Sequence, residues 1–178
     1  MLSYLYYTEN VRKAGNMETE RLLIDEIKES DKGDYFCNIT HDKKVLETFI
    51  CPYTETMEEL DFTKYVGSKV MFAIRLKDTG KMIGIILHFG DTEESCEIGY
   101  AIGSEYWNKG YVTEAAERFM KYCFEEMGIQ KVYASYFTGN EGSKRVMEKC
   151  GMIYDHFAEK ELTYLDKERD LTYYVKRR

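Results

Sequence analysis

A glycine-containing loop that leads straight into a long amphipathic helix constrains this chain more than any other stretch. The loop runs from Tyr106 to Gly110, and a helix is predicted from Val112 to about Met127. Its apolar residues recur at helical steps of three and four, which gives the helix one apolar face. They are Val112, Ala115, Ala116, Phe119, Met120, Cys123, Phe124 and Met127. Gly128 is expected to end the helix, because glycine adopts the left-handed conformation of a helix C-terminus without a steric penalty.

The start of this helix is a candidate anion site. Four unpaired backbone N–H groups and the positive end of the helix dipole converge there, an arrangement suited to a phosphate. Gly110 removes the side chain that would hold an anion away from the backbone, and Lys109 adds a positive charge. A plain helix start that carries a glycine would have the same sequence, so both interpretations stand at this point.

The whole chain has the composition of one ordinary globular domain. It has 178 residues, of which 44% are hydrophobic and 32% are charged, a size and balance typical of a single domain. No apolar run approaches the roughly 18 residues that a membrane helix needs. The first seven residues lack the basic start and long apolar centre of a signal peptide. We therefore expect a cytoplasmic protein with no membrane partner.

Charge and cysteine content exclude further classes. The net charge of −7 argues against a general affinity for nucleic acid, which requires a basic face, and it suits a cationic substrate such as an amine. The five cysteines form no CxxC pair, and the three histidines show no metal-ligand spacing, so no metal site is expected. Cys96, Cys123 and Cys150 fall in apolar registers and are predicted to be small buried residues in a reducing compartment.

Periodicity predicts one mixed sheet covered by helices. Strands are expected at 21–27, 70–76, 82–89, 96–102, 131–137, 152–159 and 169–175, and helices within 30–50 and at 56–66, 112–127 and 142–150. The three strands from 70 to 102 form an antiparallel meander. The expected fold class is α/β with a central, mostly antiparallel mixed sheet and helices on both faces, in one domain over residues 17–178. Residues 1–16, with tyrosines at 4, 6 and 7 that could form an extra strand, are treated as an N-terminal appendage.

Two helices carry specific expectations. Thr56 and Glu59 fit a capping box, in which a hydroxyl and a carboxylate satisfy each other's backbone donors, so a helix is predicted to begin there. Within residues 30–50, one apolar face is expected to contain Val45, Leu46, Phe49 and Ile50.

Glu97 is the first candidate for chemistry. Along strand 96–102, alternation points the bulky residues one way and Glu97, Gly99 and Ala101 the other. A face that is small apart from one carboxylate lets a ligand lie close to the strand. A solvated glutamate on an antiparallel strand is the alternative interpretation.

Asn140 and Ser143 form a second candidate, between the strand that ends at Phe137 and the following helix. Both residue types are good helix caps, which is the simpler interpretation. The functional interpretation places their side chains in the gap between two strands, facing the loop before Val112.

Taken together, these segments resemble the GCN5-related N-acetyltransferase (GNAT) superfamily, and most of all its ribosomal-protein N-terminal acetyltransferase branch. The resemblance runs from about Met17 to Val175 and rests on four motifs in the correct order and spacing. They are Glu18-Thr19-Glu20-Arg21-Leu22, Glu97-Ile98-Gly99-Tyr100, Tyr106-Trp107-Asn108-Lys109-Gly110-Tyr111-Val112-Thr113-Glu114-Ala115, and Asn140 to Met152. The expected fold is accordingly a GNAT-like domain whose sheet is splayed at a cofactor cleft.

The resemblance implies acetyl-coenzyme A as the donor and a primary amine, a protein N-terminus or a small amine, as the acceptor, with direct attack in a ternary complex. The pantetheine arm would pair with strand 100–102, where a backbone N–H would polarise the thioester carbonyl. The pyrophosphate would lie on residues 109–113, and the neighbouring helix start would complete the site. The cofactor-binding residues implied in this way are Tyr100, Ala101, Ile102, Lys109, Gly110, Tyr111, Val112, Thr113, Asn140 and Ser143.

Glu97 matches the carboxylate that many members use as a general base. An amine with a pKa near 10 is almost wholly protonated at neutral pH, so it must lose a proton before it attacks. A carboxylate in a partly dry cleft has a raised pKa that suits this task.

The chain departs from the family pattern at two places. Trp107 and Val112 replace the first and last residues of the phosphate-loop consensus, which leaves the backbone donors in place. The tyrosine that protonates the leaving thiolate in many members would fall at Met147. Water, Ser143 or Tyr136 could supply the proton, and a thiol of pKa about 8.5 is a fair leaving group unaided.

Two rival readings remain. The first is a non-catalytic acyl-coenzyme A-binding or regulatory module, which the methionine at 147 favours. The second is an unrelated α/β domain with a fortuitous phosphate loop, which predicts no coenzyme A binding. The acceptor identity is left open among a protein N-terminus, a polyamine, an amino acid and an aminoglycoside. A homodimer is common among relatives, although no residue pattern indicates one.

Overall fold

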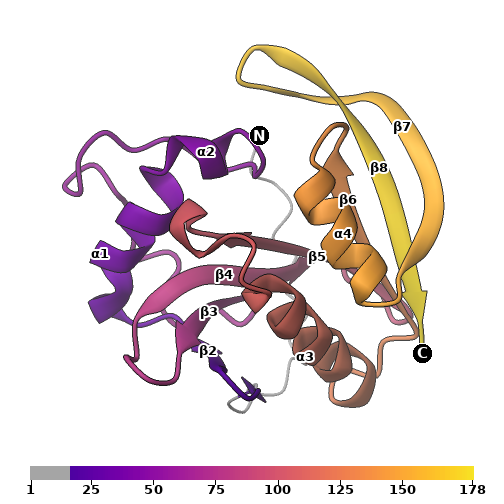
Figure 1. Ribbon diagram of the computed structural model, residues 1–178, viewed down its shortest axis with the longest axis horizontal. Coiled ribbons are helices and arrows are strands. Elements are labelled where there is room, and N and C mark those ends of the chain that lie inside the picture. The colour runs from indigo at the N-terminus through magenta and orange to yellow at the C-terminus, as the bar shows by residue number, and fades with distance from the viewer. Residues whose placement is uncertain (1–16) are drawn as a thin grey trace.

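The computed structural model describes residues 17–178, which are built on one eight-stranded sheet (Figure 1). The strands are β1 (Met17–Glu18), β2 (Leu22–Glu26), β3 (Met71–Leu76), β4 (Met82–Phe89), β5 (Ser95–Ile102), β6 (Lys131–Phe137), β7 (Ile153–Tyr164) and β8 (Lys167–Arg177). Their spatial order is β1-β2-β3-β4-β5-β6-β8-β7. All neighbours are antiparallel except β5 and β6. The predicted mixed α/β sheet is confirmed, whereas the N-terminal appendage and the strand considered for residues 4–7 lie outside the described residues.

Helices cover both faces of this sheet. On one face lie α3 (Tyr111–Glu125) and α4 (Glu141–Lys149). The other face carries the helical segment made of α1 (Lys32–Tyr35), a π-helical turn (Phe36–Thr40) and α2 (Lys43–Leu46). No helix in the described part of the chain is long and apolar enough to cross a membrane.

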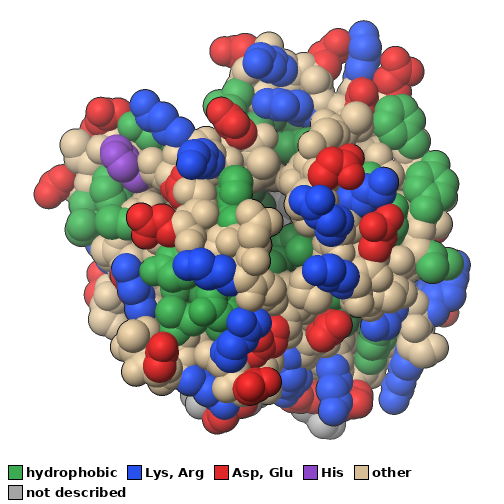
Figure 2. All heavy atoms as spheres, viewed as in Figure 1, with side chains coloured by type: hydrophobic (Ala, Val, Ile, Leu, Met, Phe, Trp, Pro, Cys, Tyr) green, Lys and Arg blue, Asp and Glu red, His purple; other side chains and the backbone are tan. Residues whose placement is uncertain are grey.

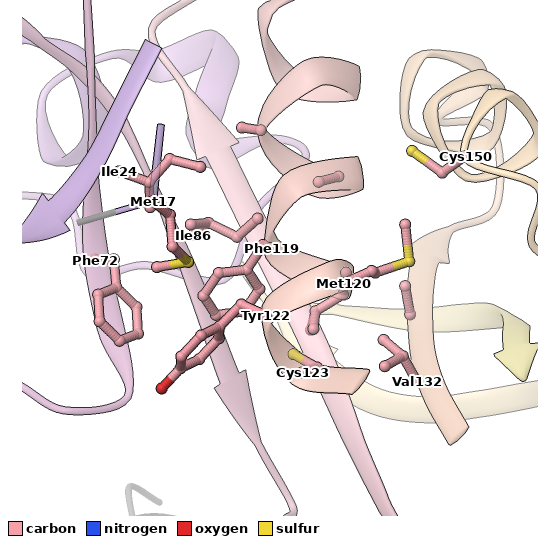
Figure 3. Packing of buried hydrophobic residues seen from close by; sticks show 14 of the residues in the cluster. Met17, Ile24, Phe72, Ile86, Phe119, Met120, Tyr122, Cys123, Val132 and Cys150 are labelled. Carbon is pink, nitrogen blue, oxygen red and sulfur yellow. The ribbon is translucent and has the colours of Figure 1, made fainter. Parts of the chain in front are cut away.

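The α3 face holds the larger of two buried clusters, because α3 presents its apolar stripe directly to the sheet. Figure 3 shows Phe119 directed toward Ile86 and Phe72, whereas Met120 points away from them, to the side where Val132 and Cys150 lie. The second cluster lies on the opposite face and includes Ile39, Val45, Phe62, Ile85 and Ala101. The predicted alternation of β5 is confirmed, since Ile98 and Ile102 join the first cluster and Ala101 joins the second. The predicted burial of Cys96, Cys123 and Cys150 is confirmed as well.

The sheet opens between its two parallel strands. β5 pairs with β6 only over Ser95 to Glu97, against Lys131 to Tyr133. Beyond Glu97, β5 continues to Ile102 and stays paired with β4, whereas β6 continues to Phe137 and stays paired with β8. The two strands therefore diverge from Glu97 onward, which produces the expected splay and leaves one backbone edge of β5 without a strand partner among residues 17–178.

The helix predicted for residues 56–66 is wrong. That segment forms turns without a helix, and the expected capping pair is replaced by a bond from the Glu55 N–H to Glu59 Oε2 at 3.2 Å. The physical reason lies at Leu60 and Phe62, which are both buried although they are only two residues apart. A helix would turn them about 200° away from each other, so it could not bury both against one core. Ile50, predicted on an apolar face, is 54% exposed, whereas Val45 and Leu46 are buried.

The last two strands form a longer hairpin than the sequence predicts. β7 and β8 continue through the expected loop at 159–169 and turn over Leu165 and Asp166, both at positive φ. Near the turn, the Tyr164 hydroxyl donates to the carbonyls of Phe49 and Cys51, at 3.1 and 3.0 Å. This contact ties the hairpin to the segment after α2, so the two elements border the splayed region from opposite sides.

Gly84 keeps β5 in register against β4, and Gly84→Ala is expected to destabilise the protein. An added Cβ would lie 2.9 Å from Ile102 Cα and even closer to the Ala101 carbonyl oxygen, and neither backbone atom can move without displacing β5. We expect a loss of about 1–3 kcal/mol in the free energy of unfolding, measured by denaturant titration.

Gly33→Ala is the matched control for this substitution. Gly33 lies in α1 and has open space around an added Cβ, so we expect a small gain in stability from the better helix propensity of alanine. Equal stability changes for the two variants would contradict the close-approach argument.

Candidate active site

The loop before α3 brings unpaired N–H groups to the edge of the splay. Gly110 is the N-cap of α3 with φ of +81°, and Asn108 also has a positive φ of +61°. The Glu114 N–H reaches the Gly110 carbonyl at 3.1 Å, and this is the first intrahelical bond. The N–H groups that precede Glu114 in this first turn have no acceptor within the helix, so an anion could accept from them. Trp107 folds back onto β5, where its Nε1 donates to the Ile102 carbonyl at 2.9 Å.

The free edge of β5 carries its own set of backbone groups. The Gly103 N–H donates to the Ile83 carbonyl of β4 at 3.0 Å. Because alternate residues of a strand turn their N–H and C=O groups to opposite edges, Ala101 also faces β4. The backbone groups of Tyr100 and Ile102 therefore face the gap toward β6. The Ile102 carbonyl already accepts the hydrogen bond from Trp107. An extended ligand in the gap could pair with this edge as an added strand would.

The start of α4 forms the opposite wall. Asn140 caps this helix, since its Oδ1 accepts the Ser143 N–H at 3.1 Å. The Ser143 hydroxyl lies 3.0 Å from the Tyr100 hydroxyl, which also donates to the Ser143 carbonyl at 3.3 Å. Burial raises the pKa of the Tyr100 phenol, so this phenol stays protonated. Met147, one turn further along α4, is only 1% exposed.

Glu97 lies where β5 and β6 begin to diverge, on the face opposite α3. Its Oε1 accepts a hydrogen bond from the Ser135 hydroxyl of β6 at 2.7 Å. Burial raises the pKa of the Glu97 carboxyl, and the Glu161 charge adds to this effect, while the Ser135 hydrogen bond and His156 oppose it. Glu97 is therefore a stronger base than an ordinary glutamate, and it lies next to the gap.

Ser135, Tyr173 and His156 continue a polar and aromatic row across the sheet from Glu97. Tyr173 pairs directly with Ser135 across β8 and β6, and its ring stacks on the His156 ring with centroids 4.4 Å apart. Burial, together with the charges of Glu97 and Glu161, raises the pKa of Tyr173 to about 12. Two carboxylates and a stacked aromatic pair therefore line this side of the opening, an environment that favours a cation.

The splay gathers the candidate residues from four separate segments around one opening. The loop at 109–113, the edge of β5, the start of α4 and Glu97 all border the divergence of β5 and β6. Figure 2 shows a hollow near the centre of this view, between α4 and the half of the molecule that holds α3 and β5, with lysine and arginine side chains on both sides. Of the residues named from sequence, Ala101 differs because its backbone groups face β4.

Sequence reasoning missed four residues that shape this region: Arg21, Glu114, Ser135 and Glu161. Ser135 falls on a predicted strand, but only the pairing of β6 with β5 shows that it reaches Glu97. Arg21 and Glu114 were present in two separate motifs, yet no local pattern joins residues 93 positions apart. The opposite charges of Arg21 and Glu114 were the one feature of the sequence that could have indicated this pairing.

An open sheet, a free strand edge and a helix N-terminus at the same gap define a protein that can hold an elongated, anionic donor beside a carboxylate. Residues 21–153 match the family described as the acetyltransferase (GNAT) domain. The N-acetyltransferase YnaD of Bacillus subtilis, named as uncharacterized, is 33% identical over 151 residues, which cover 82% of this chain and 86% of YnaD. The chain therefore belongs to the GNAT family, and it is an N-acetyltransferase.

Solved structures agree with this assignment. A GNAT-family acetyltransferase from Bacillus anthracis matches with a TM-score of 0.83 and 28% identity, over 92% of this chain and 98% of that one. Spermidine N-acetyltransferase from Vibrio cholerae, solved with CoA and spermine, matches with a TM-score of 0.75 and 16% identity, over 89% of this chain and 96% of that one. The second similarity shows the fold alone. The expected family and fold are confirmed.

Proposed function

We propose that residues 17–178 form an enzyme that transfers an acetyl group from acetyl-coenzyme A to a primary amine by direct attack in a ternary complex. The observation that carries this proposal is the divergence of β5 and β6 at Glu97. It places a free strand edge and a carboxylate of raised pKa at the same opening. No acyl-enzyme step is needed, because the amine and the thioester can meet in the gap.

The donor fits the residues around the splay. Its pyrophosphate is assigned to the N–H groups at the start of α3, which the dipole and Lys109 make favourable for an anion. Its pantetheine arm is assigned to the edge of β5, where the N–H of Tyr100 or Ile102 can stabilise the oxyanion of the attacked thioester. Ala101 contributes by its small side chain, since its backbone faces β4. The remaining residues assigned to the donor are Gly110, Tyr111, Val112, Thr113, Asn140 and Ser143.

Proton transfer is assigned to Glu97, and stabilisation of the departing thiolate to Ser143. Glu97 takes a proton from the incoming ammonium, directly or through one water, and its raised pKa suits that role. The departing thiolate needs a proton, or can leave unaided because its pKa is about 8.5. The Ser143 hydroxyl, 3.0 Å from the Tyr100 hydroxyl, can stabilise the departing thiolate by a hydrogen bond where Met147 cannot, and water can supply the proton.

The acceptor is assigned to the opening between the segment after α2 and the β7–β8 hairpin. Glu97, Glu161 and the stacked rings of His156 and Tyr173 line the hairpin side. This charge distribution favours an amine that arrives as a cation over an anionic acceptor. Among the acceptors left open, a polyamine, an aminoglycoside or a protein N-terminus meets that requirement. The buried free thiols of Cys96, Cys123 and Cys150 fit a cytoplasmic enzyme.

A non-catalytic acyl-coenzyme A-binding module is the second candidate, because Met147 is buried and offers no phenol at that position. The decisive experiment incubates the purified protein with acetyl-coenzyme A and a panel of amines and follows thiol release. We expect release that depends on an amine and is largest for cationic acceptors. Tight binding of coenzyme A by calorimetry, with no release for any amine, would select the binding module instead. No binding at all would reject both.

A further inference from the structure

The side chain of Arg21 joins the first β-hairpin to the loop before α3 through three kinds of contact. Its Nη1 donates to the Lys109 carbonyl at 3.0 Å. Its Nε donates to Glu114 Oε2 at 2.7 Å, and Nη2 forms an ion pair with the same oxygen at 2.7 Å. The guanidinium carbon also lies 4.5 Å from the centre of the Tyr111 ring, in a cation–π contact. One side chain therefore contacts two residues of the segment to which the pyrophosphate is assigned, Lys109 and Tyr111, and also Glu114 directly after it.

The bond to Lys109 fixes the direction of a peptide group. In a trans peptide the C=O of one residue and the N–H of the next point in opposite directions. Because the Lys109 carbonyl points to Arg21, the N–H of Gly110 points away from Arg21. Gly110 lies at φ of +81°, where glycine leaves the peptide free to rotate. The Arg21 contact is thus what selects one orientation of this N–H.

The charge of Glu114 gives Arg21 a second, electrostatic role beside the anion site. It is a carboxylate in the first turn of α3, where its charge would repel an incoming pyrophosphate. Burial alone would raise its pKa, but hydrogen bonds from Thr19 and Arg21 outweigh burial and hold the pKa low, so the charge is present at neutral pH. The Thr19 hydroxyl and the Arg21 N–H and guanidinium all donate to this carboxylate, and Arg21 supplies the only formal charge among these donors.

We propose that Arg21 is a positioning residue for the acetyl-coenzyme A pyrophosphate. It orients the Gly110 N–H outward and cancels the charge of Glu114 beside the anion site. This inference rests on the proposed function, because it concerns how that donor binds. It assigns a role in donor affinity to the Thr19–Arg21 segment, which forms the turn between β1 and β2 and lies more than 80 residues from the loop in sequence.

The test compares acetyl-coenzyme A with acetyl-pantetheine, which lacks the whole nucleotide part of the donor, the pyrophosphate included. For Arg21→Gln we expect kcat/KM for acetyl-coenzyme A to fall about 10- to 100-fold, the effect of losing hydrogen bonds that involve a charged group. The fall should lie in KM rather than kcat. With acetyl-pantetheine, which lacks the pyrophosphate, the same variant should lose less than about threefold. Arg21→Lys keeps the charge without the fork geometry and should give an intermediate loss, and adding Glu114→Gln to Arg21→Gln should recover part of the affinity.

Lys77→Gln is the matched control. Lys77 donates to the Thr19 carbonyl at 2.7 Å and pairs with Glu18 at 2.9 Å. It therefore holds the same hairpin without touching the loop, and its loss should leave donor affinity unchanged. Equal losses with both donors for Arg21→Gln, or a loss matched by Lys77→Gln, would overturn the positioning role in favour of a structural one. Wild-type protein that binds no coenzyme A would instead overturn the proposed function, and the inference with it.

Discussion

Replacing Glu97 by glutamine is expected to lower kcat by about 10²- to 10⁴-fold, the usual contribution of a general base. Glutamine has the same shape and can still accept the hydrogen bond from Ser135, but it cannot take a proton from the amine. Steady-state thiol release gives kcat, and calorimetry gives the dissociation constant for acetyl-coenzyme A. That constant should change little, because Glu97 lies on the face opposite α3 and the turn to which the pyrophosphate is assigned.

The pH dependence tests the same assignment independently. A base acts in its deprotonated form, so kcat/KM should fall as pH drops through the pKa of Glu97, which is raised above the ordinary glutamate value. The charge of Glu161 contributes to that rise, so Glu161→Gln should lower the Glu97 pKa and move the acid limb to lower pH. Glu159→Gln, on the same strand at an exposed position, is the control and should leave the limb in place. Unchanged turnover in Glu97→Gln would make Glu97 a bystander.

Local patterns in the sequence predict the elements that surround the site. The bounds of β4 and β6 and the start of α3 agree within one residue, because each rests on periodicity with clear turn residues at its ends. The helix predicted for residues 56–66 is wrong because that prediction rests on a local pattern alone. Its capping pattern is local, but the burial of Leu60 and Phe62 is a tertiary demand that outweighs a cap of about 1 kcal/mol.

The connections between elements are the part that a single sequence cannot predict. Ser135 reaches Glu97 only because β6 lies beside β5 rather than beside β4, and Arg21 reaches Glu114 only because β2 and α3 lie close together. Many strand orders are compatible with the same strands, and the period-two alternation of side chains is identical in all of them. Alternation therefore cannot indicate which strands are neighbours. The individual candidate residues are therefore visible in sequence, whereas the contacts that tune their pKa values and orientation are not.

Arg75 holds the most strongly buried ionic cluster among the described residues, and its replacement is expected to have the largest effect on stability. Its guanidinium donates to Asp25 Oδ1 at 2.5 Å and to both carboxylate oxygens of Asp31 at 2.5 and 2.6 Å. All three residues are at most 6% exposed. Arg75→Met removes the cation and leaves two buried carboxylates, of which Lys28 reaches only Asp25 with its side chain. We expect a loss of about 3–5 kcal/mol, the range for breaking a buried pair on one side.

Unfolding by guanidinium chloride should show this loss as a lower midpoint concentration, with an unchanged dependence of the unfolding free energy on denaturant. Arg75→Met combined with Asp31→Asn should be less destabilised than the sum of the single variants, because the second change removes one uncompensated charge. Additive losses would contradict the assignment of the effect to buried charge.

The pH dependence of that loss separates charge from packing. In the wild type, burial alone would raise the pKa of Asp31, but the hydrogen bonds and charge of Arg75, together with the Lys28 N–H and charge, outweigh burial and hold the pKa low. The stabilising contribution is therefore present at neutral pH and is lost as pH falls through this lowered pKa. In Arg75→Met, burial acts without the cation, so the pKa of the Asp31 carboxyl rises and its protonation relieves the variant as pH falls. The stability difference should be largest near neutral pH and should shrink as pH falls through the raised Asp31 pKa of the variant, starting above the ordinary aspartate value of about 4, whereas a packing defect would give the same difference throughout.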